Sequence, residues 1–133
     1  MPKLFIIDDN ESRVNEILED VERVGFTKGE VRIADNEKDA MELIASDVPD
    51  IAIVDVNLTA QLQKEGLRVI QALSDKHRGC LIICITSQGN IQLGADAIDS
   101  GASDFIDQEW AYINGYELIK QKLAIYKNLK ERE

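Results

Sequence analysis

The sequence predicts an α/β protein in which five parallel strands form one sheet covered by five helices, in a doubly wound arrangement. Short apolar segments alternate along the chain with segments whose apolar residues recur every three or four positions. The runs at 51–54 and 81–85 are continuously apolar, which is typical of strands buried on both faces of a parallel sheet. Alternating units of this length favour right-handed crossovers, which place helices on both faces.

The five predicted strands are short, and polar or turn-forming residues bound each of them. Their limits are 3–7, 30–34, 50–56, 80–86 and 104–107. The chain has 133 residues and no repeat or linker-like segment, so we expect a single domain over 1–133. Within it, we expect 1–127 to form the core and the mixed-charge segment 128–133 to be a helix end or the stub of a linker.

Each predicted helix has an apolar stripe with spacings of three and four residues. From the first helix to the fifth, the stripes are Val14, Ile17, Leu18, Val21 and Val24; Ala40, Met41 and Ile44; Leu67, Ile70 and Leu73; Ile91, Ala95 and Ile98; and Tyr116, Ile119, Leu123 and Tyr126. Asn10, Asn36 and Asn114 are candidate N-caps of the first, second and fifth helices. Gly25 and Gly101 are expected to end the first and fourth helices.

Charge and composition argue against several classes of function. The chain has 15 Lys and Arg residues and 25 Asp and Glu residues. The resulting net charge of −10 disfavours direct binding to nucleic acid. Because the apolar runs are only a few residues long and no leader opens the chain, we expect no membrane partner and a cytoplasmic location. Cys80 and Cys84 are separated by about 13 Å on a predicted strand, too far for a disulfide, and are expected to be small core residues.

Carboxylates follow the first and third predicted strands at the point where each strand ends. Asp8 and Asp9 follow the first strand, Asp55 ends the third, and Thr86 ends the fourth. In a flavodoxin-like order these three strands are neighbours, so the carboxylates converge on one pocket. Such a pocket suits Mg²⁺, and a carboxylate beside Mg²⁺ can attack phosphorus while a hydroxyl bonds a phosphoryl oxygen. Taken singly, an Asp at a strand end is common in turns and caps, so only the combination points to a site.

Four short blocks of sequence, taken together, resemble the receiver domain of two-component response regulators. The blocks are residues 8–9, 53–58, 85–87 and 101–105, which read Asp-Asp, Ile-Val-Asp-Val-Asn-Leu, Ile-Thr-Ser and Gly-Ala-Ser-Asp-Phe. The resemblance extends over essentially the whole chain. It implies that Asp55 is the phosphoacceptor and that a histidine kinase or a phosphotransfer protein supplies the phosphoryl group.

The resemblance also implies roles for the residues around the phosphoacceptor. Mg²⁺ is expected to be bound by Asp9, Asp55 and the backbone carbonyl of Asn57, with Asp8 assisting through water. Thr86 is expected to be the switch hydroxyl. These assignments follow from matching positions in the family pattern.

On the output side, the resemblance implies that Phe105 is the switch aromatic. The face formed by the fourth helix, the fifth strand and the fifth helix is expected to bind a downstream protein partner, or a second copy of the chain in a homodimer. Ile91, Trp110 and Tyr112 are expected on this face with Phe105. Trp110 has two interpretations: it plugs the core next to the fifth strand, or it anchors a partner.

The sequence departs from the family pattern after the fifth strand and in the loop after Asp55. The family carries a Lys-Pro pair whose lysine contacts the phosphoryl group, and that lysine position falls here on Gln108, which carries no charge. The segment 58–66 lacks the usual Leu-Pro and is expected to form a longer loop. Lys64 in this segment either supplies the missing charge or is an ordinary solvated lysine.

Three hypotheses follow. The leading one is an atypical receiver domain that is phosphorylated on Asp55 with Mg²⁺ and signals by protein–protein contact, and that is not classed as an enzyme. The first rival is a pseudo-receiver that binds partners without phosphorylation, because Gln108 replaces the site lysine. The second rival, a small phosphohydrolase, needs a general acid two residues after the nucleophile. Asn57 and Asn10 occupy those positions, so neither candidate nucleophile fits.

Overall fold

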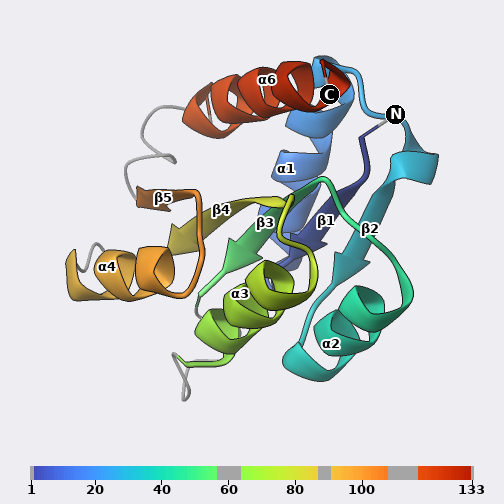
Figure 1. Cartoon of the computed structure of the whole chain (residues 1–133). Coiled ribbons are helices and arrows are strands. Elements are labelled where there is room, and N and C mark those ends of the chain that lie inside the picture. The colour runs from blue at the N-terminus through green and yellow to red at the C-terminus, as the bar shows by residue number, and fades with distance from the viewer. Residues whose placement is uncertain (1, 57–63, 87–90, 108–116, 133) are drawn as a thin grey trace.

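A computed structural model of the chain describes residues 2–56, 64–86, 91–107 and 117–132, with the side chains of residues 64, 86, 91, 107 and 117–119 outside the description. Five parallel strands form one sheet in the order β2-β1-β3-β4-β5 (Figure 1). The strands are β1 (Leu4–Ile7), β2 (Val31–Ala34), β3 (Ile51–Asp55), β4 (Leu81–Thr86) and β5 (Asp104–Asp107). Each begins and ends within one residue of its predicted limits.

Helices cover both faces of the sheet, as a doubly wound fold requires. In the described ranges they are α1 (Glu11–Val24), α2 (Glu37–Ser46), α3 (Lys64–Lys76), α4 (Ile91–Asp99) and α6 (Glu117–Glu131), with a short 3₁₀ turn, η1 (Lys28–Glu30). In Figure 1, α2, α3 and α4 lie on one face and α1 and α6 lie on the other. This arrangement confirms the predicted fold class.

The predicted helix ends agree with the structure wherever it describes them. The side chain of Asn10 accepts a hydrogen bond from the backbone N–H of Arg13 at 3.1 Å, and Asn36 caps α2 in the same way. Gly25 ends α1 with a φ of 104°, and Gly101 follows α4 with a φ of 120°. Both are left-handed conformations that glycine adopts without the steric cost of a side chain. The predicted cap Asn114 lies outside the described residues.

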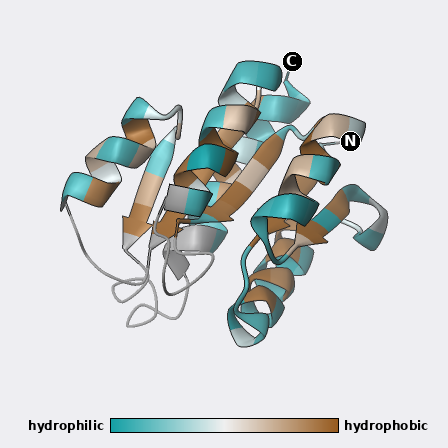
Figure 2. Cartoon of the chain, turned by 90° about the horizontal axis from the view of Figure 1, so that it is seen from below, coloured by the Kyte–Doolittle hydropathy of each residue, from teal (hydrophilic) through white to brown (hydrophobic). Residues whose placement is uncertain are grey.

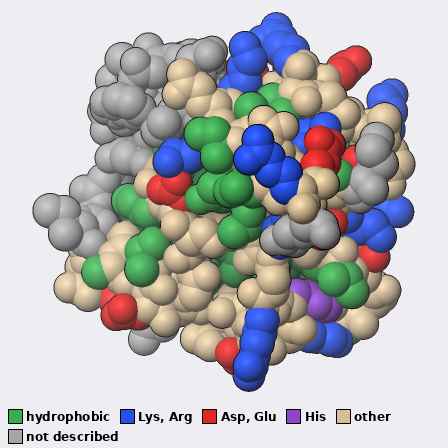
Figure 3. Space-filling view, turned by 45° about the horizontal axis from the view of Figure 1, so that its top comes forward, with side chains coloured by type: hydrophobic (Ala, Val, Ile, Leu, Met, Phe, Trp, Pro, Cys, Tyr) green, Lys and Arg blue, Asp and Glu red, His purple; other side chains and the backbone are tan. Residues whose placement is uncertain are grey.

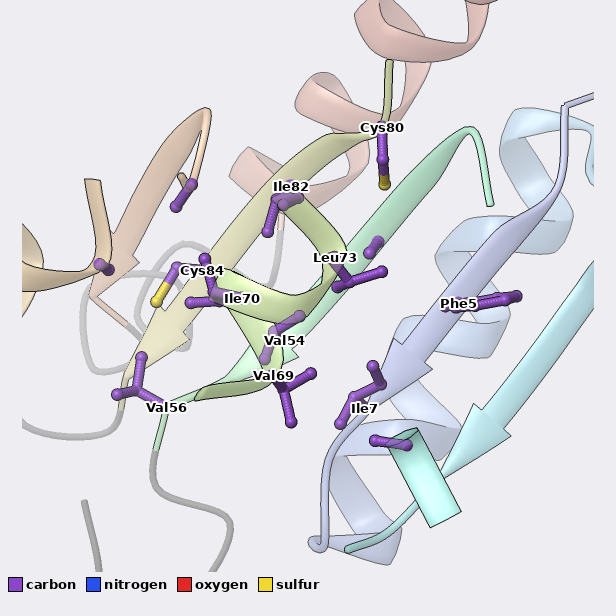
Figure 4. Close-up of a cluster of buried hydrophobic side chains, with 14 of the residues drawn as sticks. Phe5, Ile7, Val54, Val56, Val69, Ile70, Leu73, Cys80, Ile82 and Cys84 are labelled. Carbon is purple, nitrogen blue, oxygen red and sulfur yellow. The ribbon is translucent and has the colours of Figure 1, made fainter. Parts of the chain in front are cut away.

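The alternation of side chains along each strand divides the core into two layers. One layer lies between the sheet and α2, α3 and α4, where Val69, Ile70 and Leu73 pack against Val54 and other strand residues (Figure 4). The other layer lies between the sheet and α1 and α6. Figure 2 shows hydrophobic residues on the strands and on the sheet-facing sides of the helices. Burial on both faces explains the continuous apolar runs of the three central strands, β1, β3 and β4.

The predicted apolar stripe of the fourth helix was wrong at Ala95 and Ile98, and the side chain of its third member, Ile91, lies outside the described residues. Among the described side chains of α4, the buried apolar ones are those of Leu93 and Ala97, and Gly94 is also buried, whereas Ala95 is exposed and Ile98 is 47% exposed. A Cβ at Gly94 would lie 3.2 Å from the ring of Phe105, so this glycine allows the buried face of α4 to approach β5 closely. Leu93 and Ala97 are also apolar and four residues apart, so the periodicity of this short helix did not decide between two faces.

The two cysteines and the outer surface agree with the composition. Cys80 and Cys84 are buried and free, which confirms their predicted place in the core.

On the face that carries α6, Ile125 and Leu129 are about half exposed, and hydrophobic side chains lie among charged ones (Figure 3). Within the described ranges, no helix is both long enough and apolar enough to cross a bilayer.

Candidate functional site

The register of the sheet brings Asp8 and Asp55 side by side. Ile7 of β1 pairs with Val54 of β3. Asp8 directly follows Ile7, and Asp55 directly follows Val54. Both aspartates continue the side of their strand that faces α1, because Ile6 and Ile53, two residues earlier, belong to the core layer under that helix. Each aspartate is only 2% exposed. Two buried carboxylates therefore lie together at the carboxyl ends of neighbouring central strands, as the sequence predicted.

Asp9 completes the predicted acidic cluster at the surface of the pocket. Carboxylate oxygens of Asp8, Asp9 and Asp55 lie within 4.8 Å of one another, and Asp9 is the exposed member. Desolvation and the neighbouring charge of Asp8 raise the pKa of the Asp9 carboxyl, and the exposed Asp35 at the end of β2 adds to this effect. Three oxygen donors this close together fit a hard divalent cation such as Mg²⁺.

A buried arginine shares the pocket with these carboxylates, and the sequence reasoning did not identify it. Arg13 is 5% exposed, and its Nη2 donates hydrogen bonds to Asp55 Oδ2 at 2.6 Å and to Asp8 Oδ1 at 2.7 Å. Its Nε donates to the other oxygen of Asp8, and the backbone N–H of Asn10 donates to Asp8 Oδ1 at 2.9 Å. One guanidinium therefore bridges the two buried aspartates.

The position of Arg13 in α1 explains its burial. It is the third residue of the helix and lies one turn before Ile17, so it extends the inward-facing side of α1 toward the strand ends. A cation in the first turn is disfavoured by the helix dipole, and the neighbouring carboxylates offset that cost. The four-residue spacing between Arg13 and Ile17 indicated in the sequence that Arg13 lies on the buried side of α1. A charged residue at the end of an apolar stripe is usually exposed to solvent, however.

The structure describes only part of the predicted switch. Phe105 is half-buried and pairs with Cys84 across the sheet, and its ring packs beside Gly94. The backbone of Thr86 ends β4 and pairs with Asp107, one strand away from Asp55. The remaining predicted site and output positions, or their side chains, lie outside the described residues: Asn57, the Thr86 side chain, the Ile91 side chain, Gln108, Trp110 and Tyr112.

The first turn of α3 fixes the backbone at Asp55, a constraint that sequence reasoning missed. The backbone N–H of Gly66 donates to the carbonyl of Val56 at 3.3 Å. A Cβ at Gly66 would lie 2.3 Å from Val56 Cα and 2.5 Å from the carbonyl oxygen of Asp55, so this contact requires glycine. Because α3 begins at Lys64, residues 64–66 are helical, and the predicted loop over 58–66 was too long at its end.

Comparison with known proteins identifies the family. The family model described as "Response regulator receiver domain" matches residues 4–120. The chain belongs to the response regulator receiver domain family. A receiver domain is a signalling module that works with histidine kinases and output domains, rather than an enzyme in the usual sense.

Two curated relatives are longer response regulators. PilR of Pseudomonas aeruginosa is 32% identical over 104 residues, which cover 78% of this receiver domain and 22% of PilR. MprA of Mycolicibacterium vanbaalenii is 27% identical over 111 residues, which cover 84% of this receiver domain and 46% of MprA. The chain thus spans less than half the length of these relatives.

Solved structures share the fold. A CheY-like receiver domain protein from Methanospirillum hungatei has a TM-score of 0.76 at 20% identity, covering 96% of this chain and 98% of that one. A response regulator protein from Burkholderia pseudomallei, solved with a phosphorylated aspartic acid, a calcium ion and citrate, has a TM-score of 0.70 at 24% identity. That comparison covers 92% of this chain and 73% of the Burkholderia chain.

Proposed function

We propose that this receiver domain accepts a phosphoryl group on Asp55 from a histidine kinase or a phosphotransfer protein. The observation that carries the proposal is the position of Asp55 at the carboxyl end of a central strand, 2% exposed and beside two other carboxylates. A strand-end carboxylate held in an acidic pocket of a receiver fold is suited to act as a nucleophile toward phosphorus.

The reaction is a transfer between two nucleophiles. A carboxylate oxygen of Asp55 attacks the phosphorus, an oxygen–phosphorus bond forms, and the phosphorus–nitrogen bond of the donor phosphohistidine breaks. The electron pair of the broken bond stays on the donor imidazole, which takes up a proton from solvent. The product on this chain is an acyl phosphate. Gly66 and the first turn of α3 hold the Asp55 backbone in place during the attack.

The carboxylates of Asp8, Asp9 and Asp55 fit a divalent cation, and we assign Mg²⁺ to them together with the backbone carbonyl of Asn57. When bound, the cation neutralises the repulsion between the carboxylates and draws charge from the phosphoryl oxygens. Thr86 is the last residue of β4, and we assign to its hydroxyl a hydrogen bond to a phosphoryl oxygen on the basis of this position. Phe105 on β5 is proposed to respond to that contact.

The output of this receiver domain is proposed to be protein–protein contact through α4, β5 and α6. Phe105, Ile91, Trp110 and Tyr112 are the residues that we assign to this face. A downstream protein partner or a second copy of the chain is the proposed occupant. The half-buried ring of Phe105 supports the assignment, because a side chain in this position can move between the core and the surface.

A pseudo-receiver is the second candidate, and one observation favours it. Arg13 already holds Asp55 in a buried ion pair, and the family lysine position is proposed to be Gln108. In a pseudo-receiver, the ion pair between Arg13 and Asp55 persists and Asp55 is not phosphorylated. Partners then bind at all times, without a signal from a kinase.

Phosphorylation separates the two candidates. The full chain is incubated with acetyl phosphate or carbamoyl phosphate and Mg²⁺, and then with a panel of histidine kinases, and the intact mass is measured. We expect the mass of one phosphoryl group to be added to wild type and to the control Asp75→Asn, which changes an exposed carboxylate on α3, but not to Asp55→Asn. No added mass with any donor would favour the pseudo-receiver.

A further inference from the structure

Arg13 and a divalent cation require the same carboxylates. We propose that Arg13 is an internal competitor of Mg²⁺, which neutralises Asp8 and Asp55 when the metal is absent and must release at least Asp55 before the metal is fully bound. The inference concerns the site of the proposed phosphotransfer and rests on that function only for its consequence in signalling. Competition for the metal can be tested with no phosphodonor present.

The contacts of Arg13 explain why it is a competitor rather than a neutral neighbour. Its Nη2 lies 2.6 Å from Asp55 Oδ2 and 2.7 Å from Asp8 Oδ1, and its Nε bonds the second oxygen of Asp8. An oxygen that accepts a charge-assisted hydrogen bond has less electron density to offer a metal. A bound Mg²⁺ would also be repelled by a guanidinium in the same pocket.

Burial makes the competition strong. Arg13, Asp8 and Asp55 are each at most 5% exposed, so solvent screens their attraction weakly. A buried carboxylate without a counter-ion is costly, and Arg13 provides one counter-ion to two such groups. The metal must therefore replace these interactions as well as bind.

The remaining charge shows where the metal can enter. Among the residues that the structure describes in this pocket, three carboxylates and one guanidinium give a formal charge of −2, which attracts a divalent cation. Asp9 is the exposed carboxylate and lies beside the ion pair. We infer that the metal binds first at Asp9 and then displaces Arg13 from Asp55. If the site is phosphorylated, this displacement raises the Mg²⁺ concentration that phosphorylation requires.

The first test compares Mg²⁺ affinity in wild type, Arg13→Gln and Arg23→Gln by isothermal titration calorimetry. Arg23 lies on the same helix and is largely exposed, so Arg23→Gln makes the same charge change away from the pocket. We expect Arg13→Gln to bind Mg²⁺ at least about tenfold more tightly than wild type, because charge-assisted hydrogen bonds of this kind no longer compete. We expect Arg23→Gln to stay within about twofold of wild type, because exposed charges are screened.

The outcomes of this comparison are decisive. Equal affinities for wild type and Arg13→Gln, or weaker binding by Arg13→Gln, would overturn the proposal. No binding to either protein would also overturn it, since nothing would then compete. An equal gain in Arg23→Gln would show that only net charge matters, which likewise rejects the competition.

A second measurement uses wild type alone and covers the case in which Arg13→Gln does not fold. In ¹⁵N-labelled protein, the Nη2–H resonance of Arg13 reports its bonds to Asp55 and Asp8. We expect Mg²⁺ to shift this resonance, or broaden it by exchange with solvent, in parallel with the backbone signal of Asp9, and to leave the side-chain resonances of Arg23 unchanged. Saturation of the Asp9 signal with the Arg13 resonance unmoved would contradict displacement. Failure to phosphorylate Asp55 would leave both measurements interpretable.

Discussion

The ring of Phe105 packs against the backbone of Gly94, so closely that a Cβ at position 94 would lie 3.2 Å from two atoms of the ring. This contact joins β5 to α4 on the face proposed for output. Because Phe105 is only half-buried, its ring can yield to added volume, whereas the backbone of α4 cannot.

Gly94→Ala is therefore expected to move Phe105 rather than to unfold the domain. Alanine favours the helix by about 1 kcal/mol over glycine, which offsets part of the crowding. We expect the free energy of unfolding to change by less than about 1 kcal/mol, while the NMR signals of the Phe105 ring shift toward those of an exposed aromatic. The control is Gly29→Ala, because a Cβ at position 29 meets nothing within 4 Å. Unchanged ring signals would contradict the close packing.

Gly66→Ala is expected to be much more harmful, because the obstacle is backbone. The added Cβ would lie 2.3 Å from Val56 Cα and 2.6 Å from the Val56 carbonyl oxygen. We expect a loss of about 2–3 kcal/mol in the free energy of unfolding measured with urea, together with reduced phosphorylation of Asp55. A variant as stable as Gly29→Ala would show that α3 can move away from β3 at no cost.

Asp9→Asn and Asp8→Asn are expected to change metal-free stability in opposite directions. Repulsion among the three carboxylates predicts that removing any one is stabilising. The buried bond from Arg13 reverses this for Asp8, because the guanidinium would lose a charged partner, and we expect Asp8→Asn to cost about 3 kcal/mol. Asp9→Asn should stabilise the metal-free protein. Urea denaturation in the presence of a chelator measures both, and equal signs would contradict this account.

The effect of Asp9 depends on pH in a defined direction. Its folded-state pKa is raised above the usual 3.8, so the folded protein binds this proton more tightly than the unfolded chain does. The contribution of Asp9 is therefore most favourable below pH 3.8 and is lost as the pH rises through the raised folded-state pKa. We expect the stability gain of Asp9→Asn over wild type to be near zero at the acid end and to grow toward neutral pH. A stability gain that does not change with pH would show that the raised pKa of Asp9 is not its cause.

The two cysteines are expected to resist alkylation in the folded protein. Burial raises the pKa of the Cys80 thiol to about 12 and raises that of Cys84 further, so neither is a thiolate near neutral pH. Iodoacetamide at pH 8 should modify neither within minutes, and both should react in urea, as read by intact mass. Rapid modification of the native protein would show that β4 opens locally.

Gln108→Lys tests the departure from the family pattern. A lysine gives a charge-assisted hydrogen bond to a phosphoryl group, worth about 1–2 kcal/mol more than the neutral bond of glutamine. We expect beryllofluoride with Mg²⁺ to bind about tenfold more tightly to this variant than to wild type. Unchanged affinity in a folded variant would indicate that position 108 does not face the site, or that Arg13 or Lys64 already supplies the charge.

Local patterns in the sequence were enough to predict the sheet, most helix ends and the acidic pocket. Strands buried on both faces need continuous apolar residues, and this requirement made the runs at 51–54 and 81–85 visible without a structure. Asn10 and Gly25 end α1 through interactions within a few residues of themselves. Asp8 and Asp55 could be paired because the fold class alone makes β1 and β3 neighbours.

Contacts between elements far apart in the chain were decided only by the tertiary structure. Arg13 is buried because α1 directs its third residue at two strand ends, and a charged side chain has no hydropathy signal for burial. Gly66 is required by its close approach to the backbone at the end of β3, and Gly94 lets the Phe105 ring of β5 pack closely on α4. The sequence of a helix does not show which neighbour its glycines approach. Such contacts depend on the distance between packed elements, which the periodicity of a single segment does not encode.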